Sequence, residues 1–216
     1  MPPEFVVAID GPAGAGKSTV ARAVARALDG FVYLDTGAMY RAVTAYLLRD
    51  GNAETSVEQM AQAADGLEQG DGRYVVHGED VTKMIRTPEV TGDVSRVSAV
   101  PAVRRIIQAK QRELTGRLIA EGRDIGSVVF PAAPLKIYLD AALDQRAQRR
   151  HREYPDTDAQ SFAETIERRD SLDSTRDDSP LMCPEDAVRI DTTKLTIEEV
   201  VEQVVALTRE RLARTT

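Results

Sequence analysis

A glycine-rich segment near the N-terminus carries the residue types and the spacing of a phosphate-binding loop. Residues 11–18 read GPAGAGKS and fit the pattern G-x-x-x-x-G-K-[ST]. Glycines allow the backbone N–H groups of such a loop to converge on phosphate oxygens, and a following helix adds the positive end of its dipole. Lys17 can reach the β- and γ-phosphates, and the hydroxyl of Ser18 can ligate Mg²⁺. The segment predicts that the chain binds a nucleoside triphosphate.

Two charged segments are expected near the same loop. LDTGAMYR, which ends at Arg41, and EGRDIG, which begins at Glu121, each follow a short apolar run typical of a strand. Ligands of open parallel sheets bind beyond the carboxyl ends of the strands. Arg41 and Arg123 are therefore candidates for binding an anionic substrate, and Glu121 or Asp124 could orient water around Mg²⁺. The alternative is a helix start with a surface arginine in the first segment and a solvated turn in the second.

The charge run RRDSLDSTR, residues 168–176, is either solvated helix surface or a charged face that a helix turns inward. At 100° per residue, five residues of this region fall within about 80° of one another on a helical wheel. They are Phe162, Ile166, Arg169, Asp173 and Arg176. Because Phe162 and Ile166 should face the interior, the three charged members are expected to point into a cleft. Arg168 and Asp170 lie off this stripe and are expected at the surface.

Short apolar runs alternate with helical patterns and predict an α/β fold, with a parallel sheet that is covered by helices on both faces. Strands are expected at 5–9, 31–34, 117–121, 135–139 and 187–190. Helices are expected at 17–28, 38–48, 102–115, 142–153, 159–175 and 197–213. Residues 51–95 break the alternation and are expected to form an inserted subdomain with an antiparallel hairpin that turns at Gly78.

The composition narrows the class of protein. A chain of 216 residues is long enough for one well-packed domain, and no apolar run approaches the ~20 residues of a membrane span. A net charge of −7 argues against a nucleic-acid surface. The single cysteine, Cys183, excludes an internal disulfide and favours a cytoplasmic location. We therefore expect a cytoplasmic protein that binds small molecules rather than a nucleic acid or a membrane.

Six segments of the chain, taken in order, resemble segments of bacterial cytidylate kinases. The likeness covers about residues 5–207. They read IDGPAGAGKST, LDTGAMYRAVT, GEDVT with IRTPEV, EGRDIGSVVFP, RRDSLDSTR and DAVRIDTT. The resemblance implies a P-loop kinase with a five-stranded parallel sheet flanked by helices, in a single monomeric domain of residues 1–216. Within this domain it implies a monophosphate-binding insertion at 37–99 and a small lid at 146–158. The implied reaction is transfer of the γ-phosphoryl group of ATP to CMP or dCMP, with Mg²⁺ as the cofactor.

The same resemblance implies a role for each matching residue. The loop that holds ATP consists of Gly11, Pro12, Ala13, Gly14, Ala15, Gly16, Lys17, Ser18 and Thr19, with Ser18 on the metal. Recognition of the cytosine ring falls to Thr36, Arg104, Asp124 and Arg176, and contacts around the sugar fall to Ser95, Arg169 and Asp173. The expected catalytic residues are Lys17, the monophosphate arginines Arg41 and Arg123, and the lid arginines Arg146, Arg149 and Arg150.

Two other functions share parts of this pattern. The first is a different small-molecule P-loop kinase, which would act on another nucleoside monophosphate or on an acceptor such as shikimate. The second is a nucleotide-gated regulatory ATPase, which the sequence favours less because no long apolar strand ends in adjacent acidic residues. Cys183, His77 and His151 are too isolated to indicate a nucleophile, a base or a metal site.

Overall fold

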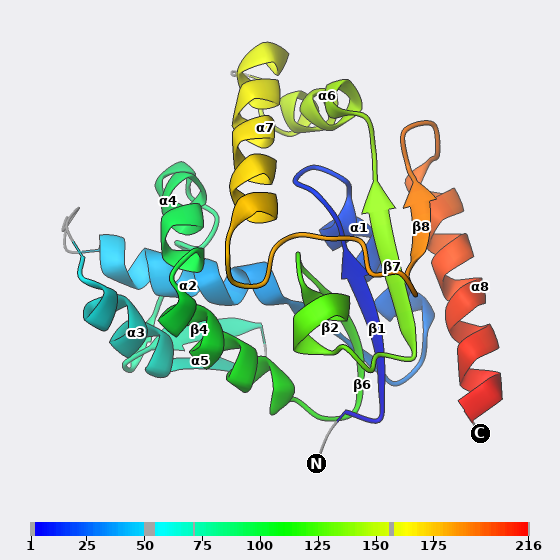
Figure 1. Ribbon diagram of the computed structural model, residues 1–216, viewed down its shortest axis with the longest axis horizontal. Coiled ribbons are helices and arrows are strands. Elements are labelled where there is room, and N and C mark those ends of the chain that lie inside the picture. The colour runs from blue at the N-terminus through cyan, green and yellow to red at the C-terminus, as the bar shows by residue number, and fades with distance from the viewer. Residues whose placement is uncertain (1–2, 50–54, 71, 156–157, 216) are drawn as a thin grey trace. The chain divides into compact units, whose positions relative to one another are not determined.

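The computed structural model describes residues 3–49, 55–70, 72–155 and 158–215 (Figure 1). The chain divides into two compact units. The first unit combines Met1–Leu34 with Leu114–Thr216, and the second unit is Asp35–Glu113.

The first unit is built on a five-stranded sheet with the strand order β2-β6-β1-β7-β8. The central strand β1 pairs in parallel with both β6 and β7, and β7 pairs in parallel with β8. All six residues of β1, FVVAID, are buried, as expected for a strand in the middle of a sheet whose two faces are covered. The strands are β1 Phe5–Asp10, β2 Phe31–Asp35, β6 Arg117–Glu121, β7 Leu135–Asp140 and β8 Val188–Asp191. This order confirms the predicted α/β fold and all five predicted strands.

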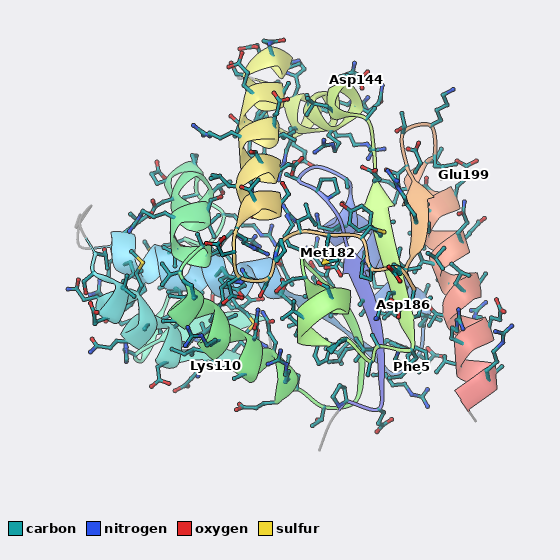
Figure 2. The ribbon with its side chains drawn as sticks, viewed as in Figure 1. Phe5, Lys110, Asp144, Met182, Asp186 and Glu199 are labelled. Atoms are coloured by element: carbon teal, nitrogen blue, oxygen red, sulfur yellow. The ribbon has the colours of Figure 1, made fainter. Side chains whose placement is uncertain are left out.

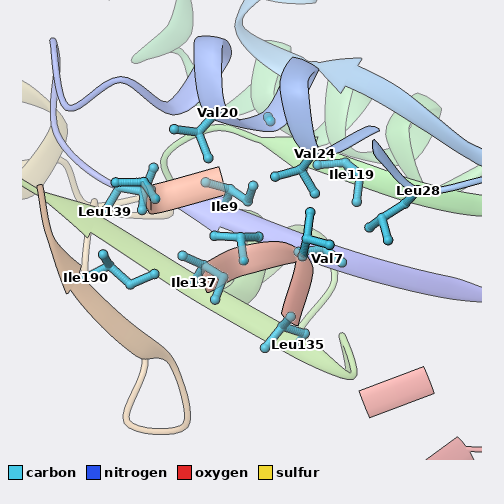
Figure 3. Packing of buried hydrophobic residues seen from close by; sticks show 14 of the residues in the cluster. Val7, Ile9, Val20, Val24, Leu28, Ile119, Leu135, Ile137, Leu139 and Ile190 are labelled. Carbon is cyan, nitrogen blue, oxygen red and sulfur yellow. The ribbon is translucent and has the colours of Figure 1, made fainter. Parts of the chain in front are cut away.

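Helices cover this sheet and form two apolar clusters within the first unit. In the larger cluster, α1 and α8 pack on the sheet, and Val24 of α1 is buried with Ile9 and Ile137 (Figure 3). Val204 of α8 belongs to the same cluster. In the smaller cluster, Ala13 is buried with residues of α6 and α7. The helices are α1 Lys17–Ala27, α6 Leu143–Glu153, α7 Ala159–Thr175 and α8 Ile197–Thr215, and a π-helical turn, η1, spans Ile125–Val129.

A connecting segment between α7 and β8 is tied to the sheet by an ion pair. Met182 and Asp186 lie on this segment (Figure 2), and Asp186 pairs with Lys136 of β7 at 2.7 Å. The Lys136 side chain is only 10% exposed, whereas that of Asp186 is 65% exposed. The contact therefore fixes an otherwise irregular stretch against β7.

The described residues of the second unit, 35–49, 55–70 and 72–113, form four helices and a small antiparallel sheet of order β3-β4-β5. The predicted hairpin is confirmed: β4 and β5 pair antiparallel, and Gly78 turns between them with φ 81°. Helix α3 begins with a capping box between Ser56 and Gln59, and α4 begins after Thr87 with a proline at its first position. The elements are α2 Thr36–Leu48, α3 Val57–Asp65, β3 Leu67–Gly70, β4 Arg73–Val76, β5 Glu79–Asp80, α4 Pro88–Ser98 and α5 Pro101–Arg112.

Candidate active site

The backbone of the glycine-rich loop takes a path that requires glycine. A Cβ atom at Gly11, where φ is 147°, would lie 2.0 Å from the carbonyl oxygen of Leu139. Gly14 and Gly16 have φ values of 76° and 92°, in the left-handed region that residues with a Cβ avoid. The loop therefore turns tightly against β7 and leads directly into α1, which begins at Lys17.

Lys17 is buried beneath this loop. Its Nζ atom donates a hydrogen bond of 2.7 Å to the carbonyl oxygen of Pro12. Burial lowers the pKa of Lys17 well below its usual value, the positive charge of Arg123 lowers it further, and the carboxylate of Glu121 opposes the shift. Neighbouring negative charge therefore balances the positive charge of Lys17 only in part, and this favours the binding of an anion.

Side-chain oxygen atoms of Ser18 and Glu121 lie next to each other beside the loop. Ser18 Oγ donates a hydrogen bond of 2.7 Å to Glu121 Oε1, and the hydroxyl of Tyr33 donates to the same oxygen at 3.2 Å. Hydroxyl and carboxylate oxygens are the ligands that Mg²⁺ prefers, directly or through water. The residues present therefore fit a Mg²⁺ ion, and of the two acidic candidates only Glu121 contacts Ser18 in the described part of the chain.

Asp10, at the end of β1, organises the loop that follows β6. Its carboxylate accepts the backbone N–H groups of Ile125 at 2.8 Å and Gly126 at 2.7 Å, and so holds the first turn of η1. Burial raises the pKa of Asp10 to about 6, although the two hydrogen bonds act in the opposite direction.

Four charged side chains of alternating sign connect this loop to the C-terminal end of α7. Arg123 Nε lies 2.8 Å from Asp173 Oδ2, and Arg176 lies 3.6 Å from Asp173 and 4.0 Å from Asp124. Burial would raise the pKa of Asp173, but Arg123, Arg169 and Arg176 together hold it below its usual value. Burial likewise opposes the charge of Arg123, yet Asp173 keeps the pKa of that arginine above its usual value.

Burial confirms the predicted inward orientation of the four stripe residues that lie on α7, whereas Arg176 lies just beyond the helix in extended backbone. Ile166 and Asp173 are buried, and Phe162, Arg169 and Arg176 are partly buried. The roles proposed for the three charged members, around the sugar and the base, stay predictions.

The prediction that Asp170 lies at the surface is wrong. Its side chain is only 19% exposed, it accepts the N–H of Ala13 at 2.8 Å, and it pairs with Arg146. On the wheel Asp170 lies about 40° beyond the edge of the stripe, next to Ala163, which packs against the small cluster around Ala13. The buried face of α7 is therefore wider than the stripe, because α6 and the glycine-rich loop cover its flank. Arg168 is exposed, as expected.

The three arginines predicted to line the lid have three different environments. Arg146 is buried and donates to the carbonyl oxygens of Ala13 and Ala141, both at 2.9 Å. Arg149 donates to the carbonyl oxygen of Thr192 at 2.6 Å, and Arg150 pairs with Glu153 at 2.7 Å. The predicted lid, 146–158, includes residues 156–157, which lie outside the described residues, and its bounds stay a prediction.

In the second unit, a single buried carboxylate holds two arginines. Asp35 caps α2 by accepting the N–H of Ala38 at 2.9 Å, and it pairs with Arg41 at 2.9 Å and Arg86 at 3.0 Å. Arg41 is a predicted site residue. Arg86 is not among the residues assigned from the sequence, although it lies in the segment IRTPEV that carries part of the resemblance. The segment that contains Arg86 therefore stands out in the sequence, but the pairing of Arg86 with Asp35 is not evident from it.

The remaining predicted residues are divided between the two units. Arg104, in the second unit, is buried, donates to the carbonyl oxygen of Ser98 at 3.1 Å, and lies 5.4 Å from the centre of the Tyr40 ring. Thr36 is buried at the start of α2, Ser95 is partly buried on α4, and Thr19 is exposed on α1. Asp124 and Arg176, assigned with Thr36 and Arg104 to the cytosine, belong to the first unit. These roles stay predictions.

Similarity to known proteins is extensive. A family model described as "Cytidylate kinase" matches residues 7–210. The cytidylate kinase of Solibacter usitatus is 49% identical, over 96% of this chain and 93% of that protein. The cytidylate kinases of Streptomyces griseus and Caldanaerobacter subterraneus are each 47% identical, and the alignments cover 94% and 92% of this chain and 91% and 92% of those proteins. No helix among residues 3–49, 55–70, 72–155 and 158–215 is both long and apolar enough to cross a membrane.

The raised pKa of Asp10 predicts a specific dependence of stability on pH. In the folded chain Asp10 keeps its proton up to a pKa of about 6, whereas the unfolded value is 3.8. The contribution of Asp10 is therefore fully present below about pH 4, and it is lost as the pH rises through 6. Relative to Asp10→Asn, the free energy of unfolding of the unmodified chain should fall by about 2 kcal/mol between pH 4 and pH 7. Urea denaturation of both proteins at several pH values measures this difference, and a difference that does not change with pH would contradict the assignment.

Proposed function

The chain belongs to the cytidylate kinase family, and on that premise we propose that it transfers the γ-phosphoryl group of ATP to CMP or dCMP, giving ADP with CDP or dCDP. One structural observation carries the proposal. The glycine-rich loop with its buried Lys17 and the network of Arg123, Asp173 and Arg176 lie in one compact unit, where Arg123 is close enough to lower the pKa of Lys17. A site of this kind offers one set of cations to a triphosphate and another to a second anion.

The chemistry of phosphoryl transfer makes modest demands on such a site. Alignment of two anionic substrates and neutralisation of their charge supply most of the catalysis. The loop N–H groups and Lys17 would hold the donor phosphates, and Arg123 would neutralise charge on the side of the acceptor. A phosphate monoester is mostly dianionic at pH 7, because its second pKa is about 6, so the acceptor needs no general base.

We propose that Arg41 and Arg86, both held by Asp35, bind the monophosphate, and that Thr36 and Arg104 contribute to recognition of the cytosine. In this proposal residues 37–99 are the monophosphate-binding part of the chain and residues 146–158 are the lid. The proposed enzyme is monomeric and cytoplasmic, and the single cysteine, Cys183, agrees with a reducing compartment.

The fit of Ser18 and Glu121 supports Mg²⁺ as the cofactor. When bound, the ion would neutralise charge on the β- and γ-phosphate oxygens. Ser18 would hold the ion through its hydroxyl, and Glu121 would hold it through a water molecule, with Tyr33 fixing the orientation of the Glu121 carboxylate.

A change at Glu121 tests this arrangement. In Glu121→Gln the side chain keeps its size but loses its charge, so the free Mg²⁺ concentration that gives half-maximal rate should rise by about tenfold. Initial rates are measured against Mg²⁺ at saturating ATP and CMP. The matched control is Glu202→Gln, which changes an exposed glutamate on α8 and should leave the curve unchanged. Superimposed curves for Glu121→Gln and the unmodified enzyme would contradict the role of Glu121.

An acceptor panel separates the proposed reaction from that of another P-loop kinase. ATP is offered with CMP, dCMP, UMP, AMP or shikimate at equal concentrations, and the phosphorylated products are quantified. We expect CMP and dCMP to have the highest kcat/KM. A panel without preference for either cytidine nucleotide would contradict the proposal.

The regulatory ATPase is separated by a different readout. In a single turnover with labelled ATP, a kinase places the γ-phosphoryl label on CDP when CMP is present. Release of inorganic phosphate at a rate that CMP does not change would favour the ATPase.

A further inference from the structure

Asp170 makes two contacts that the proposed reaction does not yet use. One carboxylate oxygen, Oδ1, accepts the backbone N–H of Ala13 at 2.8 Å. The other, Oδ2, pairs with Nη1 of Arg146. The partners come from three places in the sequence, because Ala13 lies in the glycine-rich loop, Arg146 on α6 and Asp170 on α7.

These contacts close into a ring around Ala13. Arg146 Nη1, besides pairing with Asp170, donates to the carbonyl oxygen of Ala13 at 2.9 Å. The N–H and the C=O of Ala13 are thus both bonded, one to the carboxylate and one to the guanidinium. Arg146 is itself fixed, since its Nε donates to the carbonyl oxygen of Ala141 at 2.9 Å.

Packing restricts the same residue. The methyl group of Ala13 is buried in an apolar cluster with Ala147 of α6 and Ile166 of α7. Arg146 also approaches the next residue of the loop, because a Cβ atom at Gly14 would lie 3.1 Å from Cβ of Arg146. Ala13 is therefore the point at which a glycine-rich loop is anchored to two helices.

The anchor acts on the part of the loop that should bind phosphate. A segment with glycines at positions 11, 14 and 16 has large conformational freedom when nothing holds it. N–H groups stabilise an anion most strongly when they are already oriented toward it. Fixing both polar groups of Ala13 sets the direction in which the chain enters Gly14 and the N–H groups that follow.

We propose that Asp170 is a positioning residue for ATP, holding the glycine-rich loop in its phosphate-binding conformation through Ala13 and Arg146. The inference rests on the proposed function for the identity of the nucleotide. Asp170 touches neither substrate in this account and acts through the loop. Its carboxylate also favours the protonated forms of Lys17 and Arg123, both of which face the phosphates in the proposed reaction.

Three variants of α7 test the proposal. Asp170→Ala removes both contacts, and Asp170→Asn keeps an oxygen that can accept the N–H of Ala13 but loses the charge that faces Arg146. Glu167→Ala is the matched control, because it removes an exposed carboxylate from the same helix. The dissociation constants of ATP and CMP are measured separately by calorimetry, each without the other nucleotide, and thermal unfolding is recorded for every variant.

We expect Asp170→Ala to weaken ATP binding by about 10- to 100-fold, in line with the loss of charged hydrogen bonds, while CMP binding changes by less than about twofold. Asp170→Asn should lie between Asp170→Ala and the unmodified chain, and Glu167→Ala should match the unmodified chain. The amide proton of Ala13 should exchange with solvent faster in Asp170→Ala, which an NMR exchange experiment measures at that single residue.

Three results would overturn the proposal. The first is ATP affinity within about twofold of the unmodified chain in Asp170→Ala. The second is an equal loss of ATP and CMP affinity together with a lower Tm, which would mean that Asp170 only stabilises the fold. The third applies if Asp170→Ala does not fold. It is an Asp170→Asn variant in which both the ATP affinity and the exchange rate of the Ala13 amide proton are unchanged. An unmodified chain that fails to phosphorylate CMP would defeat the proposed function, whereas the ATP measurements would still decide the role of Asp170.

Discussion

The ion pair between Arg123 and Asp173 is the contact on which the candidate site in the first unit depends. It joins the loop after β6 to α7 at 2.8 Å, and both side chains are largely buried. A buried ion pair adds little net stability, because removing two charges from water costs about as much as their attraction returns. Apolar residues would hold the same loop and helix together at least as well. Stability alone therefore does not account for the cluster of Arg176, Arg169 and Asp124 around the pair, whereas the proposed acceptor site does.

The parallel pairing of the sheet brings these charges to the glycine-rich loop. Ile9 of β1 lies opposite Glu121 of β6, so the two strands end side by side and the loops that follow them meet. Asp10 then fixes the loop after β6 by accepting N–H groups at the start of η1. Ser18 of α1 donates a hydrogen bond to Glu121. On α7, two neighbouring faces serve the two substrates in this account. Asp173 faces the proposed acceptor residues, and Asp170 faces the loop that would hold ATP.

The sequence predicted the parts of this structure that are determined by short-range patterns. The loop GPAGAGKS, all five strands of the main sheet, the hairpin at Gly78 and the inward stripe of α7 each depend on neighbours within a few turns or one strand. Helices α3 and α4 were missed although Ser56 with Gln59 and Thr87 with Pro88 mark their starts. Contacts across the fold could not be derived in this way. The burial of Asp170 requires that α6 and the loop cover one flank of α7, and the pairing of Arg86 with Asp35 joins residues 51 positions apart.

The most direct test of the central claim is a comparison of CMP and ATP affinities in Asp173→Asn, a change that keeps the shape of the side chain and removes the charge between Arg123 and Arg176. We predict that CMP affinity falls by about 100-fold, and that ATP affinity stays within about twofold of the unmodified enzyme. The matched control is Asp177→Asn, an exposed carboxylate just beyond α7, which should change neither affinity. Equal losses of both affinities in Asp173→Asn, or no loss of either, would contradict the claim that the charged network around Asp173 serves to bind CMP.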